Sequence, residues 1–100
     1  MCGLFGVIHK KEFLVNENEF LKNLDILNNR GPDFTGFDFF NNKNISFKFG
    51  HKRLSILDLS REGNQPFKTK NGSILIFNGE IYNHYSIRRI IEKNIKVSWK

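Results

Sequence analysis

The chain of 100 residues carries a formal net charge of +6 and is long enough for one domain with a modest core. Its one cysteine excludes an internal disulfide, and there is neither a signal-peptide core nor an apolar run that could span a bilayer, which predicts a reducing, cytoplasmic setting without membrane contact. Lysines and arginines occur singly or in pairs without interleaved stacking aromatics, so the positive charge indicates a solvated surface rather than a nucleic-acid interface.

The first third of the chain predicts a strand followed by a helix. Residues 2–8 are typical of a buried strand, and the polar residues 9–12 predict a turn after it. Asn16 or Asn18 can cap the helix that follows. The core-facing side of that helix is predicted from the spacing of Phe20, Leu21, Leu24 and Leu27. Residues 30–33, Arg-Gly-Pro-Asp, end the helix in a shaped loop.

The middle of the chain predicts an antiparallel sheet. Residues 34–40 and 45–49 alternate apolar and polar side chains around the turn-rich residues 41–44, which indicates a β-hairpin. A loop is expected over residues 60–66. Between the hairpin and this loop the strand pattern continues through residues 50–59, with apolar positions at Leu54, Ile56 and Leu57.

The last third predicts a second hairpin, a helix and a further strand. Asn71-Gly72 is a strong hairpin signal between the strands predicted at residues 67–70 and 73–77. Residues 95–99 predict the start of another strand. The helix predicted between these strands, from residue 83 to residue 93, has an apolar face formed by Ile87, Ile90 and Ile91. No repeat, low-complexity tract or linker divides the chain.

Cys2 is the candidate nucleophile. Removal of Met1 would leave a cysteine with its own free α-amino group, whose ordinary pKa is about 7.7 to 8.0, beside a thiol with an ordinary pKa of about 8.5. The amine can then accept the thiol proton, and no histidine is required. A lone cysteine in an apolar strand is more often a small buried hydrophobe, so Cys2 alone leaves both interpretations open.

Two further positions could complete such a site. The side-chain amide of Asn78 and the backbone N–H of Gly79 could stabilise an oxyanion, although Asn-Gly is also a common tight turn. Arg53 falls in a predicted strand that is otherwise apolar, where a bidentate contact with a carboxylate would offset the cost of its charge. The alternatives for Arg53 are a structural pair with Asp58 or Asp33, or exposure on a polar face.

The histidines do not indicate a metal site. His9, His51 and His84 lack metal-ligand spacing with one another and with Cys2, so each is interpreted as a turn or surface residue. The glycines do not form a phosphate-binding loop of the Walker or dinucleotide type. The sequence therefore predicts no metal and no nucleotide in this segment.

Five short segments carry a resemblance to a known family, and they follow one another in the order of that family: MCGLFG (1–6), RGPD (30–33), GHKRLSILDLS (50–60), GNQP (63–66) and FNGEIYNH (77–84). Together they resemble the N-terminal glutaminase domain of glutamine-hydrolysing asparagine synthetases, a branch of the class II glutamine amidotransferases. The pair of RGPD and NGEIYN is typical of the asparagine synthetase branch.

The resemblance implies a role for each candidate residue. Met1 is removed, Cys2 attacks the side-chain amide of glutamine, ammonia leaves, and water hydrolyses the glutamyl thioester. Asn78 and Gly79 form the oxyanion hole. The remaining glutamine-binding groups implied are Arg53 for the α-carboxylate, the backbone of Leu54, Ser55, Ile56 and Leu57, and Glu80 beside the substrate amine.

The resemblance also implies a fold and a context. The fold is α+β, an N-terminal nucleophile (Ntn) hydrolase sandwich of two antiparallel sheets between helix layers, and residues 1–100 would be a partial type-2 glutamine amidotransferase domain covering about its first half. The synthetase domain, absent from these residues or separate, is the expected acceptor of ammonia in amino-acid biosynthesis. ATP and magnesium are expected only there, as cofactors of the ligase reaction that amidates aspartate.

Two rival interpretations stay open. The chain could be the glutaminase domain of another amidotransferase, such as a sugar-modifying one, or an inactive truncated remnant. Half of a sandwich exposes an apolar sheet face and an open edge at residues 95–99, so these residues alone are not expected to form a competent glutaminase.

Overall fold

The computed structural model describes residues 1–10 and 15–99. Two antiparallel sheets and two α-helices give the α+β class predicted from the sequence. The elements in chain order are β1 (Gly3–Lys10), α1 (Glu17–Asp25), the 3-10 helix η1 (Ile26–Arg30), β2 (Phe34–Asn41), β3 (Ile45–Arg53), the 3-10 helix η2 (Arg61–Gly63), β4 (Phe67–Lys68), β5 (Ile74–Leu75) and α2 (His84–Asn94).

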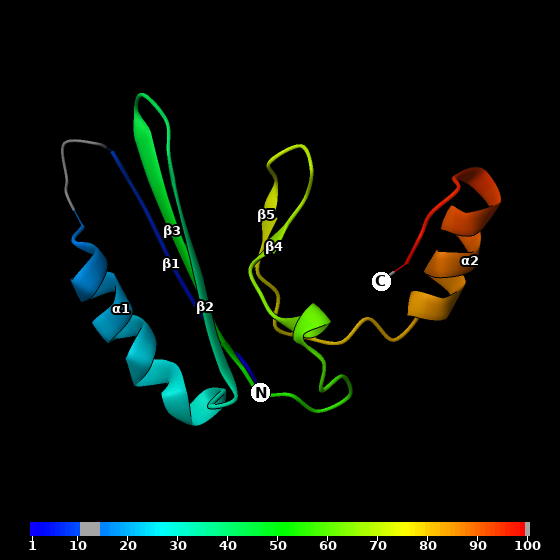
Figure 1. Cartoon of the computed structure of the whole chain (residues 1–100), viewed down its shortest axis with the longest axis horizontal. Helices are drawn as coiled ribbons and strands as arrows, with labels where there is room; N and C mark the ends of the chain where they lie inside the picture. Colours follow the sequence, from blue (N-terminus) through cyan, green and yellow to red (C-terminus); the bar gives the residue numbers. More distant parts are fainter. Residues whose placement is uncertain (11–14, 100) are drawn as a thin grey trace.

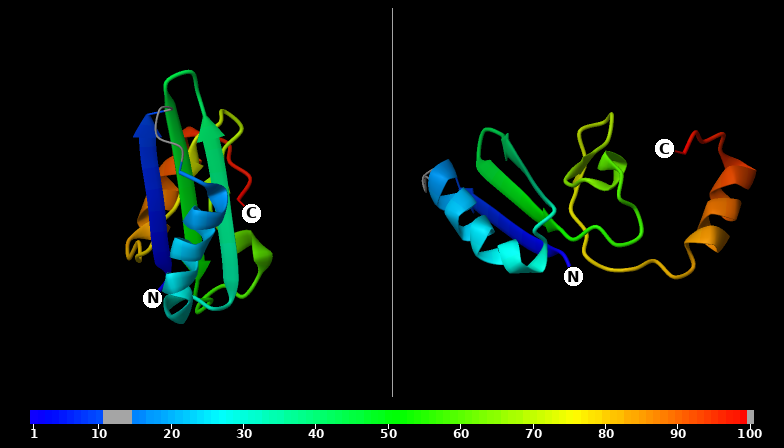
Figure 2. Two further views of the ribbon diagram at one scale, coloured as in Figure 1. Left: turned by 90° about the vertical axis from the view of Figure 1, so that its left-hand side faces the viewer. Right: turned by 60° about the horizontal axis from the view of Figure 1, so that its bottom comes forward.

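The larger sheet has the order β1-β3-β2 and is antiparallel throughout. The central strand β3 pairs along its length with both neighbours, so the predicted hairpin of β2 and β3 is confirmed, and its second strand runs from Ile45 to Arg53. α1 covers one face of this sheet (Figures 1 and 2). The strand expected to be buried at residues 2–8 instead alternates between covered and exposed side chains, because α1 shields only one of its faces.

α1 begins where the sequence places a cap. The Asn16 side chain accepts a hydrogen bond of 2.8 Å from the backbone N–H of Asn18, which decides between the two predicted caps. Phe20 and Leu24 are fully buried. The Phe20 ring packs 5.0 Å from the Phe5 ring, and each buried side chain stabilises the fold by about 1.5 to 3 kcal/mol. The predicted helix face is therefore the core of this part of the chain.

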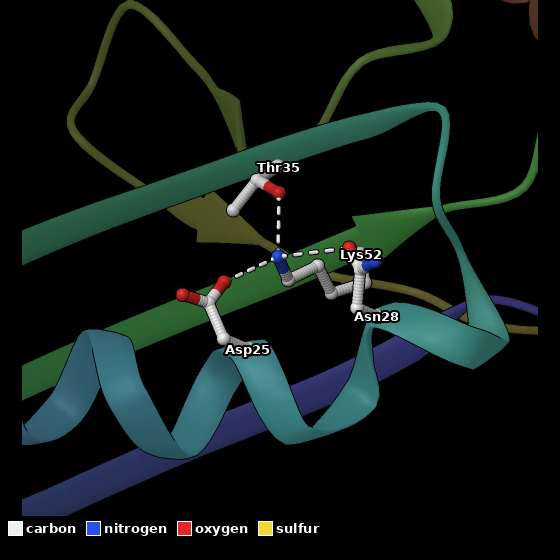
Figure 3. Close-up of polar contacts among 4 residues, drawn as sticks. All are labelled: Asp25, Asn28, Thr35 and Lys52. Atoms are coloured by element: carbon white, nitrogen blue, oxygen red, sulfur yellow. Dashed lines mark hydrogen bonds and ion pairs between the residues drawn. The ribbon is translucent and has the colours of Figure 1, made fainter.

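The Lys52 side chain of β3 contacts three other elements, as Figure 3 shows. Its side chain is only 3% exposed, and its ammonium donates to Asp25 Oδ1 at 2.6 Å, Thr35 Oγ1 at 2.8 Å and Asn28 Oδ1 at 3.4 Å. All three donors of the buried charge are thus satisfied. The contacts fasten the end of α1, η1 and β2 to the central strand.

His51 lies next to Lys52 in β3 and faces the opposite side of the sheet. It is fully buried, which corrects its interpretation as a turn or surface histidine. Burial lowers its pKa from the ordinary value of 6.5, the nearby backbone of Phe77 opposes this, and the charge of Arg53 lowers it further. Neither ring nitrogen has hydrogen-bonding geometry with any residue in the described part of the chain. His9 lies half-buried in β1 and His84 is exposed at the start of α2.

The strand predicted through residues 50–59 ends early, at Arg53. Beyond this residue the chain turns away from the sheet, because the guanidinium of Arg53 draws the following loop around itself. The backbone carbonyls of Asp58 and Ser60 both accept hydrogen bonds from it. Leu57 is 84% exposed as a result.

The second hairpin is confirmed in place and is shorter than predicted. Its strands pair only through Phe67↔Leu75 and Lys68↔Ile74. The Thr69 side chain accepts a hydrogen bond of 3.0 Å from the Ser73 backbone N–H, so the turn around Asn71-Gly72 uses residues that were expected to extend the strands.

The helix predicted at residues 83–93 is confirmed as α2, and the strand predicted at residues 95–99 is wrong. Figures 1 and 2 show α2 apart from both sheets, and Ile90 on its predicted apolar face is 62% exposed. The tail folds back onto the helix instead of pairing: Trp99 Nε1 donates to Glu92 at 2.7 Å, and the Arg88 guanidinium lies 4.9 Å from the Trp99 ring centre.

Two smaller points complete the fold. Of the turn predicted at residues 9–12, His9 and Lys10 belong to β1, and the other two residues lie outside the described part of the chain. Among the described helices, none combines the length and the apolar composition needed to cross a membrane.

Removing the acid should cost more than removing the base in the Lys52 network. Asp25→Ala leaves an ammonium that is 3% exposed without its anion, and we expect a loss of about 1 to 3 kcal/mol. Lys52→Met removes the buried charge and leaves Asp25, 70% exposed, in water, so the loss should stay below about 1 kcal/mol. Urea unfolding followed by circular dichroism would measure both. A larger loss for Lys52→Met would contradict the assignment.

His51 should make folding pH-dependent in a particular window. Its pKa is lower in the folded chain than the ordinary 6.5, so the unfolded chain takes up the proton first as the pH falls. The stabilisation is fully present above pH 6.5 and is lost as the pH falls from there toward the lowered pKa. The free energy of unfolding should decline between pH 7.5 and 5.5, and the decline should be smaller in His51→Gln.

The exposed His84 offers a matched control for this measurement. His84→Gln should keep the wild-type decline between pH 7.5 and 5.5. An equal decline in His51→Gln and the wild type would show that other groups cause it.

Candidate active site

One cavity of about 220 Å³ collects nearly all of the residues singled out in the sequence. It lies where the start of β1, the end of β3 and the segment after β5 come together. Residues far apart in the chain, such as Cys2 and Asn78, therefore share one space. The lining residues are Met1, Cys2, Arg53, Leu54, Ile56, Leu57, Asp58, Gln65, Phe77, Asn78, Gly79 and Glu80.

Ser55 is the predicted site residue that the cavity does not include. It lines a neighbouring, larger cavity of about 680 Å³ together with Asp33 and Arg61. The Ser55 backbone N–H donates to Asp33 Oδ2 at 2.7 Å. The aspartate of the 30–33 loop therefore fixes the segment that follows β3. Arg53 borders both cavities.

Cys2 directly precedes β1 and is held there by contacts to two other segments. Its Sγ accepts a hydrogen bond of 3.4 Å from the Leu54 backbone N–H and lies 3.7 Å from the Leu54 carbonyl oxygen. The Cys2 carbonyl accepts a 3.2 Å hydrogen bond from Arg30 Nε. The thiol is half-buried and free. The two contacts with Leu54 fix the position of the sulfur relative to the end of β3.

Arg53 is buried, with 7% of its surface exposed. Its Nη1 donates to the Ser60 carbonyl at 2.6 Å and to Asn64 Oδ1 at 2.8 Å, and its Nη2 donates to the Asp58 carbonyl. Three of the five N–H donors of a guanidinium are thus used by the loop. Among the described residues the other two have no acceptor, which leaves a pair of donors for a ligand.

The alternatives considered for Arg53 are decided in part by these contacts. No Asp or Glu within the described residues forms an ion pair with it, and its burial excludes simple exposure. The Asp58 carboxylate turns toward Ser60 instead and accepts a 2.8 Å hydrogen bond from its N–H. This hydrogen bond, more than the charge of Arg53, lowers the pKa of Asp58.

Gly63 allows the loop to come so close to the guanidinium. A Cβ atom at this position would collide with Arg53 Nη2, and the hydrogen bonds of Arg53 leave it little room to move away. The small residue at the start of GNQP is therefore required by a close approach, and it supports the orientation of Arg53.

Gln65 and Phe77 are site residues that the sequence analysis missed. Gln65 Nε2 donates to the Phe77 carbonyl at 3.1 Å, and the Phe77 N–H donates to Gln65 Oε1 at 2.6 Å. Phe77 directly precedes Asn78 and Gly79. Both missed residues stand inside quoted motifs, GNQP and FNGEIYNH, which was the signal available.

The site offers no metal-binding group. Across residues 1–10 and 15–99, no three side chains of His, Cys, Asp or Glu lie close enough together to hold a metal ion. The chemistry available is that of a thiol, backbone and amide N–H donors, a guanidinium and the Glu80 carboxylate.

Comparisons with known proteins identify relatives of the chain. The chain is 35% identical over 96 residues to asparagine synthetase (glutamine-hydrolysing) 1 of Bacillus subtilis. The match covers 92% of the chain and 14% of that protein. It is 33% identical over 89 residues to asparagine synthetase B (glutamine-hydrolysing) of Escherichia coli K12, covering 88% and 15%. It is 43% identical over 97 residues to amidase chyE of Penicillium rubens, covering 84% and 14%.

In eight curated matches, the chain spans between 13% and 20% of the length of the relative. No solved structure matches it significantly. The family described as the glutamine amidotransferase domain matches residues 1–99. The resemblance predicted from five motifs is thereby confirmed, and the chain belongs to the glutamine amidotransferase domain family.

Proposed function

We propose that the chain is a glutaminase domain that hydrolyses glutamine to glutamate and ammonia, and that the ammonia amidates aspartate in an ATP-dependent asparagine synthetase. One observation carries the proposal: Cys2, Arg53, Asn78 and Gly79 line a single cavity in a chain of the glutamine amidotransferase family. The cavity thus combines a nucleophile, oxyanion donors and a cation for the substrate carboxylate.

The proposed reaction begins with the removal of Met1, which frees the α-amine of Cys2. This amine takes the thiol proton, and sulfur attacks the side-chain amide carbon of glutamine. The oxyanion that forms accepts hydrogen bonds from the Asn78 amide and the Gly79 N–H. The amine returns the proton to the leaving nitrogen, ammonia departs, and water hydrolyses the thioester to glutamate.

Glutamine recognition uses both of its charged groups. The two N–H donors that Arg53 keeps outside its loop contacts bind the α-carboxylate, and Glu80 attracts the α-ammonium. The backbone around Leu54, Ile56 and Leu57 forms the wall of the cavity. For Ser55 only the carbonyl is available, because its N–H is taken by Asp33.

We extend the proposal to the fold and the context. The chain would be a partial type-2 amidotransferase domain with the layered Ntn sandwich architecture. The β4–β5 hairpin supports this, because it packs on the sheet face opposite α1: Lys68 pairs with Asp38 at 2.6 Å, and Phe47 and Ile74 border a shared apolar cavity of about 190 Å³. The proposed setting is the cytoplasm, since a thiol nucleophile needs reducing conditions.

A synthetase domain, joined or separate, is the proposed acceptor of ammonia. The relatives named as glutamine-hydrolysing asparagine synthetases favour aspartate as the substrate that is amidated. Two relatives named as amidases, chry2 and chyE, are 38% and 43% identical to the chain and favour a second candidate, a glutaminase domain with a different acceptor. Asparagine formation from aspartate, ATP and glutamine distinguishes the two.

Replacing the nucleophile should separate the two half-reactions. In the protein at its full natural length, we expect Cys2→Ala to lower glutamate release from glutamine by about a thousandfold or more, since the covalent step is lost. Amidation driven by added ammonia should continue at the wild-type rate, because it needs no thiol. Glutamate release and asparagine formation are measured in parallel. Retention of glutaminase activity would exclude Cys2 as the nucleophile.

Replacing the anchor should weaken glutamine recognition. A lysine cannot offer two parallel donors to a carboxylate. Arg53→Lys should therefore lower kcat/KM for glutamine, and the fall should correspond to a loss of about 1.5 to 3 kcal/mol of transition-state stabilisation. The control substrate is 4-aminobutanamide, which is glutamine without its α-carboxylate. The wild type should strongly prefer glutamine over it, and the variant should lose that preference. An unchanged preference would make Arg53 purely structural.

A further inference from the structure

The Gln65 side chain takes the place of a neighbouring strand. Its amide bonds both backbone groups of Phe77, donating to the carbonyl at 3.1 Å and accepting from the N–H at 2.6 Å. Such a reciprocal pair is what one rung of an antiparallel ladder provides. The chain needs it here because β5 ends at Leu75, two residues before Phe77. The oxyanion donors Asn78 and Gly79 follow directly.

Asn64, the residue before Gln65, holds a second part of the site, the guanidinium of Arg53. Asn64 Oδ1 accepts a 2.8 Å hydrogen bond from Arg53 Nη1. Two adjacent side chains of one loop therefore fix the carboxylate anchor and the segment with the oxyanion donors. The distance between these two parts of the site depends on this loop.

The loop is itself well supported. Ser60 Oγ accepts a 3.2 Å hydrogen bond from the Glu62 N–H, and the Asn64 N–H donates to the Arg61 carbonyl at 3.0 Å. On its other side the loop touches β2, where a Cβ at Gly36 would collide with the Gln65 carbonyl oxygen. The Gln65 side chain is thus presented from a fixed backbone.

We propose that Gln65 is a positioning residue that aligns the Asn78 and Gly79 donors with the thiol of Cys2. The proposal rests on the proposed glutaminase function and adds a residue to it. Gln65 acts through the backbone of Phe77, so it affects the transition state more than the binding of glutamine. Misplacing an oxyanion donor costs about a hundredfold to a thousandfold in rate.

The main test uses Gln65→Met in the protein at its full natural length. Methionine keeps the length of the side chain and removes both hydrogen bonds. We expect kcat for glutamate release to fall about a hundredfold, while KM for glutamine changes less than about threefold, because Arg53 and Asn64 are untouched. The matched control is Glu62→Gln in the same loop, since the Glu62 side chain is exposed; its kcat and KM should stay at wild-type values.

A second variant distinguishes positioning from general loop stability. In Gln65→Glu, the ionised carboxylate still accepts from the Phe77 N–H but faces the Phe77 carbonyl without a proton to donate. The protonated carboxyl restores both hydrogen bonds. We therefore expect the ratio of variant to wild-type kcat to rise as the pH falls from 8 toward 5.5, measured with enzyme shown by circular dichroism to be folded at each pH.

The outcomes are distinct. A Gln65→Met enzyme with kcat within threefold of the wild type, or one whose loss lies entirely in KM, overturns the proposal. If Gln65→Met fails to fold, Gln65→Glu decides alone, and a kcat ratio that does not change with pH overturns it. A wild-type protein that releases no glutamate, or a Cys2→Ala variant that still does, overturns the proposed function first and this inference with it.

Discussion

The buried guanidinium of Arg53 is the interaction on which the site depends. It lies at the end of the central strand, and its hydrogen bonds to two backbone carbonyls and one amide oxygen bend residues 54–64 into a loop around it. An unpaired charge at this depth would be costly, so the loop satisfies three of the guanidinium donors, two with backbone carbonyls and one with the Asn64 side chain. The loop contacts fix the orientation of the guanidinium before any ligand arrives.

The central strand β3 uses its two faces differently. Toward α1 it places Lys52 with every donor satisfied, and toward the opposite side it places the ring of His51, which has no hydrogen-bond partner among the described residues. Alternation along the strand puts these neighbouring residues in separate environments. The helix side is held by charge and hydrogen bonds around an aromatic core, whereas the opposite side buries a histidine whose pKa burial lowers.

Elements with a strong local pattern were predictable from the sequence. α1 has a cap at Asn16 and apolar residues at helical spacing, and the β2–β3 hairpin has alternating side chains around an asparagine-rich turn, so both form where the pattern predicts. Strand ends were not predictable, because they depend on tertiary contacts. β3 stops where Arg53 attracts its own loop, and the tail at residues 95–99 has no neighbouring strand in the described chain and binds α2 instead.

The sequence predicts the residues with reactive or binding groups better than the residues that hold them in place. Cys2, Arg53, Asn78 and Gly79 carry side chains or backbone freedom whose chemistry is visible in the sequence, and the structure brings them to one cavity. Gln65 was missed because its amide acts on the backbone of Phe77, and its place in the GNQP motif does not reveal that partner. The burial of His51 was missed for a similar reason. It depends on the β4–β5 hairpin and the segment after it, which lie on the sheet face opposite α1.

α2 has a different physical character from the rest of the chain. None of its residues is buried, and its side-chain contacts are internal: Arg88 with Glu92 at 2.9 Å, and both with Trp99. A helix of 11 residues held only by such contacts is marginal in water. Its backbone amides should therefore exchange their hydrogens with solvent through local opening, long before those of β3, which open only when the sheet itself comes apart. α2 is therefore expected to open more readily than the sheet whose strands position Cys2 and Arg53.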